Sequence, residues 1–340
     1  MKPLRTTPPR VIVLATGGTI AGVQDMNAAY TAGQLSANAL LSALPDLSEF
    51  ASVCVEQIAN IGSQSMTSKV WLDLMNRIRK IDANQEADAV VITHGTDTLE
   101  ETAYFLHLAL GTDLPVVLTG AMRPANAYGA DGPQNLVDAI MWAVSPEAGA
   151  TGVTVVMNGK VHNARYVQKQ VCEGLDAFDS REAGPIARVK GRQITHYTRS
   201  IGQKHGEASQ LTLEKALNTT DEKTLPRVSI YYAAALADDK MLEAVLMTKP
   251  QGIIVAGVGN GNVAGSTLSV LQEASRQGIS VVRSSRCSSG YVTRNLEVAD
   301  DAFGFIVAHD LNPQKARILL MLALQKTNDP SRIQIFFNEH

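Results

Sequence analysis

Residues 90–102, Val-Val-Ile-Thr-His-Gly-Thr-Asp-Thr-Leu-Glu-Glu-Thr, constrain the fold of this chain more than any other stretch. The segment opens as a short apolar, β-branched run, which predicts a buried strand. It turns at residues 94–95 and continues into residues 98–101, a sequence typical of the capping box at the start of a helix. Thr96 and Asp97 are therefore expected between the carboxyl end of a strand and the amino end of a helix, where open α/β sheets bind their ligands.

Similar apolar runs alternate with helical patterns through the first half of the chain. Strands are predicted at residues 10–16, 53–58, 89–93, 115–119 and 152–157. Helices are predicted at residues 36–44, 67–81 and 99–111, and from about residue 131. This alternation predicts a doubly wound parallel sheet, in which every strand-to-helix turn emerges at the same edge. The turns that carry Thr19, Ser63-Gln64 and Thr96-Asp97 are therefore expected to converge.

The length of 340 residues suggests two domains. We predict a larger N-terminal domain at residues 1–205, a polar linker at residues 206–226 and a smaller C-terminal α/β domain at residues 227–340. Within the second domain, strands are predicted at residues 227–232, 252–256 and 280–283, with a helix at residues 239–247. Asn312 and Pro313 are expected to cap and open a closing helix.

Composition and charge exclude several classes of partner. The net charge is −3 and no basic stripe is present, which argues against nucleic acid. The longest apolar run, residues 318–324, is too short to cross a bilayer. The basic N-terminus is followed by an apolar run, residues 11–15, that is too short for a signal peptide. We therefore expect a cytoplasmic protein, with the periplasm as the alternative if the sequence is a mature or truncated form.

The three cysteines favour neither a disulfide framework nor a metal site, because their number is odd and no C-x-x-C spacing occurs. No metal and no cofactor are expected. Cys54 falls in an alternating strand pattern and is predicted to be a small buried side chain.

Paired glycines follow the first predicted strand and favour a tight turn that exposes its backbone N–H groups beside the hydroxyl of Thr19. A phosphate-binding P-loop is a poor match because no lysine follows at the required spacing. The polar segment at residues 22–34 suits a mobile lid. Its one aromatic residue, Tyr30, is either an exposed surface side chain or a catalytic residue. A second glycine-rich turn, at residues 257–262, matches a dinucleotide fingerprint only weakly.

Two threonines, an aspartate and a lysine form a set suited to acyl transfer. A threonine hydroxyl is a weak nucleophile until a base takes its proton. A lysine can be that base when its amine is neutral, which burial favours and a neighbouring carboxylate opposes. We interpret Asp97 and Lys169 as an orienting and proton-relay pair whose protonation is open, and the glycine-turn N–H groups as oxyanion donors. A solvated surface lysine is the alternative for Lys169.

Two motifs resemble the signature sequences of bacterial-type L-asparaginases: residues 15–22, Ala-Thr-Gly-Gly-Thr-Ile-Ala-Gly, and residues 92–98, Ile-Thr-His-Gly-Thr-Asp-Thr. The similarity covers essentially the whole chain, including residues 120–124, 130–133, 257–262, 281–286 and 311–317. The resemblance implies hydrolysis of L-asparagine to L-aspartate and ammonia without a cofactor, by a threonine nucleophile through an acyl-enzyme. A broad-specificity glutaminase-asparaginase is the alternative.

The resemblance also implies a role for each matching residue. The catalytic residues would be Thr19 as nucleophile, Tyr30 on the lid, and a second triad of Thr96, Asp97 and Lys169. The substrate-binding residues would be Ser63, Gln64, Thr96 and Asp97, with Asn262 and Glu297 reaching in from a neighbouring subunit. The protein would then be an intimate dimer, and members of the family are typically tetramers of two such dimers. The order in which Thr19 and Thr96 act is open, and Thr19 is our preference for the first attack.

Ser63-Gln64 and Asn262 resemble the asparagine-preferring branch, since glutaminase-asparaginases tend to carry Ser-Glu at the first pair and Ser at the second position. Two rivals come from other classes. One is a non-catalytic amino-acid sensor on the same scaffold, which the complete set of candidate catalytic residues disfavours. The other is a nucleotide-dependent oxidoreductase built on residues 257–262.

Overall fold

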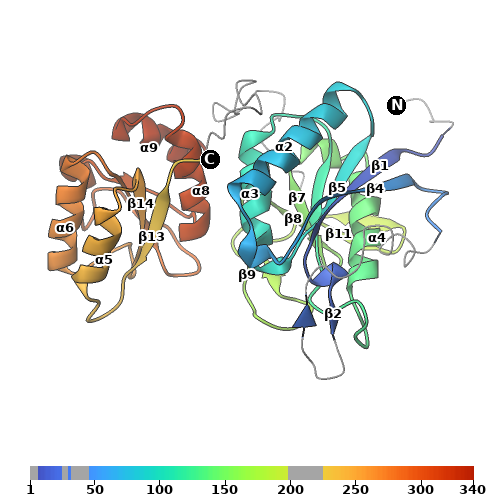
Figure 1. Ribbon diagram of the computed structural model, residues 1–340, viewed down its shortest axis with the longest axis horizontal. Coiled ribbons are helices and arrows are strands. Elements are labelled where there is room, and N and C mark those ends of the chain that lie inside the picture. Colours follow the sequence, from blue (N-terminus) through green and yellow to red (C-terminus); the bar gives the residue numbers. More distant parts are fainter. Residues whose placement is uncertain (1–6, 25–29, 32–45, 198–224) are drawn as a thin grey trace. The chain divides into compact units, whose positions relative to one another are not determined.

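The computed structural model describes residues 7–24, 30–31, 46–197 and 225–340 (Figure 1). It divides into two units, Met1–Thr212 and Leu213–His340. The helix predicted at residues 36–44 lies outside the described residues, as do all but the last two residues of the predicted linker at 206–226. Each unit is a sheet covered by helices, in agreement with the predicted α/β class.

The first unit is built on one eight-stranded sheet with the order β12-β11-β8-β7-β6-β5-β1-β4. Five neighbouring strands are parallel: β4 (Ser52–Ile61), β1 (Arg10–Gly17), β5 (Ala89–Thr93), β6 (Val116–Thr119) and β7 (Thr154–Met157). The remaining three are antiparallel: β8 (Lys160–Asn163), β11 (Ala187–Lys190) and β12 (Gln193–His196). The predicted parallel sheet is thus confirmed for five strands, and the antiparallel extension was not predicted.

The antiparallel extension begins at a two-residue turn between β7 and β8. Asn158 and Gly159 both adopt positive φ angles, 49° and 71°. An Asn-Gly pair in this conformation is the turn that best matches the twist of a two-residue hairpin. The sequence therefore contains the signal for this hairpin.

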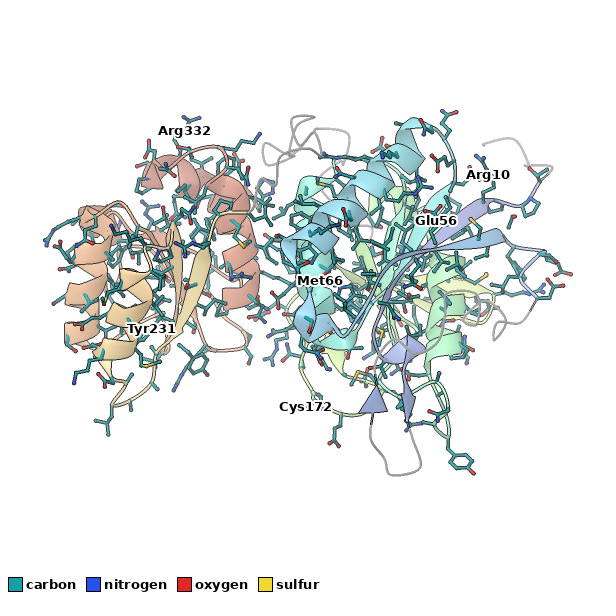
Figure 2. All side chains as sticks on the ribbon, viewed as in Figure 1. Arg10, Glu56, Met66, Cys172, Tyr231 and Arg332 are labelled. Carbon is teal, nitrogen blue, oxygen red and sulfur yellow. The ribbon has the colours of Figure 1, made fainter. Side chains whose placement is uncertain are left out.

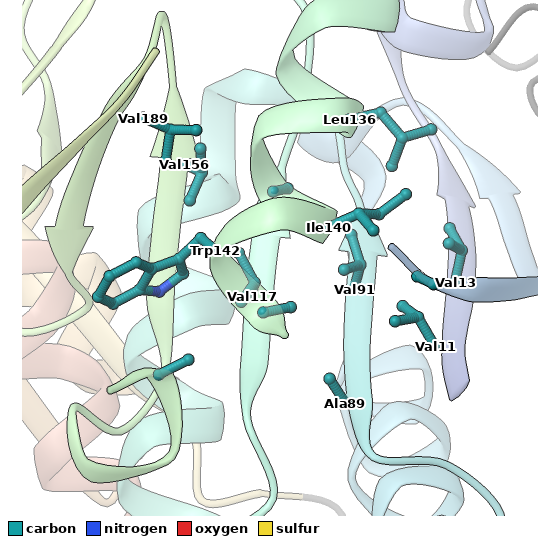
Figure 3. Close-up of a cluster of buried hydrophobic side chains, with 14 of the residues drawn as sticks. Val11, Val13, Ala89, Val91, Val117, Leu136, Ile140, Trp142, Val156 and Val189 are labelled. Carbon is teal, nitrogen blue, oxygen red and sulfur yellow. The ribbon is translucent and has the colours of Figure 1, made fainter. Parts of the chain in front are cut away.

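Helices cover both faces of the sheet (Figure 1). Helices α2 (Ser68–Ala83) and α3 (Leu99–Ala109) lie on one face, and α4 (Gly132–Ala143) lies on the other. Alternate residues of each central strand point to opposite faces. Figure 3 shows Val11, Val13 and Val91 beside Ile140 of α4, with Trp142 of the same helix farther along the sheet, toward Val117 and Val156. Because both faces are covered, the central strands are rich in valine, isoleucine and leucine, as buried parallel strands are.

The parallel strands follow the order 2-1-3-4-5 when numbered along the chain, since β4 lies on one side of β1 and β5, β6 and β7 lie on the other. The direction of winding reverses between β1 and β5. Ligands of open α/β sheets bind at the carboxyl ends of the strands beside such a reversal. The turns after β1 and β5, which carry Thr19 and Thr96, flank this point.

The second unit contains a four-stranded parallel sheet with the order β13-β14-β15-β16. Its strands are β13 (Val228–Tyr232), β14 (Gly252–Gly257), β15 (Ser280–Ser285) and β16 (Ile306–Val307), and its helices are α5 (Asp239–Met247), α6 (Gly265–Arg276), α7 (Asp300–Phe303), α8 (Pro313–Ala323) and α9 (Pro330–Glu339). The predicted start of the closing helix is confirmed, because Asn312 Oδ1 accepts a hydrogen bond from Lys315 N at 2.9 Å.

The prediction that Cys54 is buried is wrong. Strand β4 lies at the edge of the sheet, where Val53 and Val55 pack against the core and the side chain between them is exposed. Cys172 is exposed too and projects from its loop in Figure 2. Within the described ranges, no cluster of His, Cys, Asp and Glu side chains could hold a metal ion. None of the described helices is both long and apolar enough to cross a membrane.

Candidate active site

Four turns at the carboxyl ends of the parallel strands lie in direct contact. A Cβ atom built on Gly18 would lie 2.4 Å from the backbone of Gly95, and one built on Gly95 would lie 2.7 Å from Ser63 Oγ. A Cβ atom on Gly120 would lie 3.2 Å from Thr96 Cγ2. Only glycine permits backbones to approach so closely. The turns after β1, β4, β5 and β6 therefore meet, as the sequence predicted for the first three.

Two glycines set the direction in which the first turn leaves β1. Gly17 and Gly18 have φ angles of 100° and 84°, a conformation that side chains other than glycine rarely adopt. Gly18 N donates to Ile61 O at 3.1 Å, which ties the turn to β4. Thr19 then opens a short 3-10 turn, η1 (Thr19–Ala21), and its side chain is half-buried.

The capping box predicted at residues 98–101 is wrong. Thr98 precedes α3 but its side chain makes no capping bond to the helix. Instead, Thr98 Oγ1 donates to the backbone O of Ser63 at 2.8 Å. The hydroxyl thus joins the two 3-10 turns η2 (Ser63–Ser65) and η3 (Thr96–Thr98). A contact between distant turns has replaced a local one.

Lys169 lies against the third turn. It belongs to the short strand β9 (Gln168–Lys169), which pairs with β10 (Phe178–Asp179). Lys169 Nζ donates to Thr96 Oγ1 at 2.9 Å and to Asp97 Oδ1 at 2.7 Å. Thr96 is 5% exposed, whereas the Asp97 side chain is 63% exposed. A hydroxyl, an amine and a carboxylate therefore form one hydrogen-bonded chain that runs from the interior to the surface.

Glu100 holds the strand that carries Lys169. Its side chain is buried, and Oε2 accepts a hydrogen bond from Lys169 N at 2.6 Å. A bond to a charged acceptor is about twice as strong as one between neutral groups. The first turn of α3 thus fixes the backbone from which the lysine side chain extends.

The turn after β6 is fixed by a carboxylate at the start of α4. Asp131 accepts hydrogen bonds from the backbone N atoms of Met122 and Arg123 and from Asn135 Nδ2, at 2.9–3.1 Å. These bonds hold the turn that contains Gly120 beneath Thr96. The residues that resemble the family at 120–124 and 130–133 are therefore structural neighbours.

The fully buried imidazole of His94 is hydrogen-bonded to the turn after β5. His94 Nδ1 lies 2.7 Å from Gly95 O and therefore donates, while Nε2 accepts from Thr102 Oγ1 at 2.8 Å. Trp71 Nε1 donates to the same hydroxyl at 2.7 Å. Desolvation lowers the pKa of His94 from 6.5 to about 4, against the smaller opposing effect of the bond to Gly95. The ring is therefore neutral at pH 7.

This buried histidine makes stability depend on pH. Between pH 6.5 and 4 the unfolded state binds the His94 proton and the folded state does not, so the free energy of unfolding falls as the pH falls through this window. From pH 7 to pH 5 the expected loss from this group is about 2 kcal/mol. His94→Gln keeps one donor and one acceptor but does not titrate. Its loss over the same interval should be smaller by that amount.

Urea unfolding followed by tryptophan fluorescence measures this difference in the first unit alone, because Trp71 and Trp142 are the only tryptophans of the chain. Equal losses of stability in the wild type and the variant between pH 7 and pH 5 would contradict the assignment of a neutral His94.

Two predicted substrate contacts lie on η2. Ser63 is buried, and Gln64 is exposed with its amide folded over Gly62, 2.6 Å from the position of a Cβ atom there. The backbone of Tyr30 belongs to strand β3 (Tyr30–Thr31), which pairs with β2 (Val23–Gln24). The side chain of Tyr30 lies outside the described part of the chain.

The two remaining predicted residues lie together in the second unit. Asn262 ends a tight hairpin in which Val258 and Asn262 exchange both backbone hydrogen bonds, at 2.8 and 2.9 Å. Asn262 Nδ2 donates to Glu297 Oε2. The glycine-rich segment at residues 257–262 is thus a tight hairpin that ends before α6 begins.

Comparisons with known proteins agree with this architecture. Residues 10–202 match the family model "Asparaginase, N-terminal", and residues 227–337 match "Glutaminase/Asparaginase C-terminal domain". This chain belongs to the asparaginase family.

Three relatives in the family match over nearly their whole length. "Probable L-asparaginase periplasmic" of Haemophilus influenzae is 44% identical over 97% of this chain and 93% of its own. "L-asparaginase 2" of Escherichia coli is 42% identical over 98% of this chain and 93% of its own. The solved structure "Probable Cytoplasmic L-asparaginase from Campylobacter jejuni" superposes with a TM-score of 0.90 at 41% identity, covering 98% of this chain and 100% of that one. The suspected family and fold are confirmed.

The asparaginase signature motifs do not point to every residue that shapes the site. Glu100 follows the second motif closely, but sequence reasoning treated it only as part of a helix start. The buried ion pair of Arg283 and Asp300 in the second unit was not predicted either. A signal was available, because an arginine within the buried strand β15 must find a buried partner.

Proposed function

We propose that this protein hydrolyses L-asparagine to L-aspartate and ammonia through a covalent acyl-enzyme. The observation that carries the proposal is the chain from Lys169 Nζ to Thr96 Oγ1 and Asp97 Oδ1, 2.9 and 2.7 Å long, on a turn whose backbone touches the turn that presents Thr19. Two hydroxyls, an acid and an amine around one carboxamide are the groups that acyl transfer needs. The relatives named L-asparaginase support the same activity.

In the first half-reaction, Thr19 Oγ attacks the side-chain amide carbon of asparagine, and the C–O bond forms as the hydroxyl proton passes to a base. Tyr30 is proposed to assist this transfer. Backbone N–H groups of the glycine turns stabilise the oxyanion. The tetrahedral intermediate then breaks its C–N bond, and the amide nitrogen takes up a proton and leaves as ammonia.

In the second half-reaction, water attacks the ester carbonyl of the acyl-enzyme. The chain of Thr96, Lys169 and Asp97 takes a proton from this water, and the leaving oxygen of Thr19 regains its own proton. Aspartate and the free hydroxyl are the products. No added cofactor is required for this sequence of steps.

Substrate selectivity is proposed to favour asparagine over glutamine, because Ser63, Gln64 and Asp97 hold the α-carboxylate and α-amino groups at a fixed distance from Thr19. One added methylene in such a site changes kcat/KM by about 10- to 200-fold. Coupled ammonia assays on the purified protein with L-asparagine, L-glutamine and D-asparagine measure this ratio. Comparable kcat/KM values for the first two would favour a glutaminase-asparaginase, and no ammonia from any of the three would refute the proposal.

The active site is proposed to be shared between subunits of an intimate dimer, with Asn262 and Glu297 supplied by the partner, and two such dimers are proposed to form a homotetramer. Complementation tests the sharing. Thr19→Ala and Glu297→Ala are each expected to be impaired. In a mixed dimer, one site combines both defects and the other has neither.

Mixing these two variants under conditions that exchange subunits should therefore restore about a quarter of wild-type activity, since half of the dimers are mixed and one of their two sites is intact. Light scattering gives the subunit number. No recovery in dimers shown to be mixed would place all site residues in one subunit.

The compartment is proposed to be the cytoplasm, and the Campylobacter relative of known structure is named cytoplasmic as well. The Haemophilus relative is named periplasmic, and the periplasm is the alternative. Fractionation of cells that express the natural gene distinguishes the two.

A further inference from the structure

The carboxylate of Glu297 is held at both of its oxygens. Asn262 Nδ2 donates to Oε2, and Asn260 Nδ2 lies 3.3 Å from Oε1 and donates to it. Glu297 is exposed and lies in a segment without regular structure. A glutamate in such a place ordinarily samples many rotamers, and restricting it costs conformational entropy. Two amide donors from one hairpin instead define a single orientation.

Asn260 is bonded on three sides. Its Oδ1 accepts from Thr293 N at 2.8 Å, its Nδ2 faces Glu297, and its backbone O accepts from Arg283 Nη1 at 3.1 Å. The side chain therefore joins the glycine-rich hairpin to the segment that carries Glu297.

A buried ion pair anchors both of these segments. Arg283 Nε lies 2.6 Å from Asp300 Oδ1 and Nη2 lies 3.0 Å from Oδ2, with side-chain exposures of 1% and 0%. The guanidinium also donates to Gly261 O at 3.3 Å and to Thr293 O at 3.2 Å. The planar, five-donor head of arginine suits such a multiple contact. One side chain thus fixes the hairpin and the Glu297 segment relative to each other.

The hairpin itself has little freedom to adjust. A Cβ atom on Gly257 would lie 2.3 Å from the backbone of Gly261, which has a φ angle of 73°. Asn260 therefore lies in a turn whose two ends are in close backbone contact. The turn and the ion pair together form a rigid support for one surface carboxylate.

We infer that Asn260, anchored by the Arg283–Asp300 ion pair, is a positioning residue that orients Glu297 toward the cationic α-amino group of the substrate. The inference rests on the proposed function, in which Glu297 binds substrate. Asn260 acts through Glu297 and need not touch the substrate itself. Its loss should weaken ground-state binding and leave the chemical step unchanged, which raises KM and leaves kcat as it is.

The test is a double-mutant cycle between Asn260→Ala and Glu297→Ala, read as KM and kcat for L-asparagine. Asn260→Ala is expected to raise KM about tenfold, as for loss of a hydrogen bond to a charged group, with kcat within about twofold of the wild type. In the Glu297→Ala background, the same substitution should change KM by less than about twofold, because residues that act through one another are not additive.

Arg294→Ala is the matched control. Arg294 lies in the same segment, and its guanidinium bonds Asp301 at 2.8 Å and not Glu297, so KM should stay at the wild-type value. Asn260→Asp guards against a folding defect, since the carboxylate keeps an acceptor for Thr293 N in the same shape but cannot donate to Glu297. It should raise KM at least as much as Asn260→Ala does.

An unchanged KM in Asn260→Ala, or the same fold-change in both backgrounds, overturns the inference and leaves the proposed function intact. An unchanged KM in Glu297→Ala overturns it as well, because the carboxylate would then have no role in binding. A wild-type protein that releases no ammonia from asparagine refutes the proposed function and the inference together.

Discussion

Lys169→Met is expected to lower kcat for asparagine hydrolysis by about 10³-fold, with a much smaller change in KM. Methionine keeps an unbranched apolar stem but removes Nζ, which lies 2.9 Å from Thr96 Oγ1 and 2.7 Å from Asp97 Oδ1. The hydroxyl and the carboxylate then lose the group that connects them, and protons can no longer pass along the chain. Steady-state ammonia release over a range of asparagine concentrations measures both constants.

Lys160→Met is the matched control for this substitution. Lys160 Nζ lies 2.7 Å from Asp176 Oδ1, and the side-chain exposures of 25% and 63% resemble the 16% and 63% of Lys169 and Asp97. The control removes an ion pair of similar length and exposure that involves none of the candidate site residues. Its kcat should equal that of the wild type. A loss in Lys169→Met no greater than in Lys160→Met would show that Lys169 contributes only a surface ion pair.

The double variant Thr19→Ala/Lys169→Met tests whether the two groups work as one unit. Residues that act as one unit give losses that are far from additive, and the acyl-enzyme on which Lys169 is proposed to act cannot form without Thr19. We therefore expect the double variant to be about as slow as the slower single variant. A loss close to the product of the two single losses would mean that Lys169 contributes to turnover that does not pass through an acyl-enzyme on Thr19.

Much of the site could be predicted because its positions follow from the strand order. Apolar β-branched runs followed by glycine turns mark the strand ends after which Thr19, Ser63 and Thr96 appear. Parallel strands then bring those ends to one edge, so the convergence of their turns needs no knowledge of side-chain contacts. The close contact between the backbones of Gly18 and Gly95 is what this order of parallel strands predicts.

Contacts between segments that are distant in the sequence could not be predicted in the same way. The local sequence at Thr98 fits a helix cap, but the hydroxyl donates instead to the backbone carbonyl of Ser63, which lies in another turn. Cys54 alternates with buried valines, yet the sequence does not state that β4 is an edge strand. Arg283 lies in a buried strand, and the pattern that predicts the strand does not identify Asp300 as its partner. Each case depends on the position of a second segment.

The same ion pair gives the largest stability effect that we expect. Asp300→Ala should lower the free energy of unfolding of the unit Leu213–His340 by about 3–5 kcal/mol, because it leaves the buried charge of Arg283 without its partner. The backbone N of Asn295 also loses its acceptor, Asp300 Oδ2 at 2.9 Å. Hydrogen exchange of the slowest amides of β14 and β15 measures this free energy within the second unit alone.

Asp301→Ala supplies the comparison at the adjacent position. Asp301 pairs with Arg294, and its side chain is 61% exposed, so water can replace the lost partner on both sides. The two substitutions therefore remove the same chemical group one residue apart and differ in burial. If stability depends on neutralising the charge of the buried Arg283 guanidinium, only Asp300→Ala should greatly accelerate hydrogen exchange in β14 and β15. Equal acceleration by both variants would mean that loss of the buried carboxylate costs no more stability than loss of the exposed one. The Arg283–Asp300 ion pair would then not be what anchors the segment that carries Glu297.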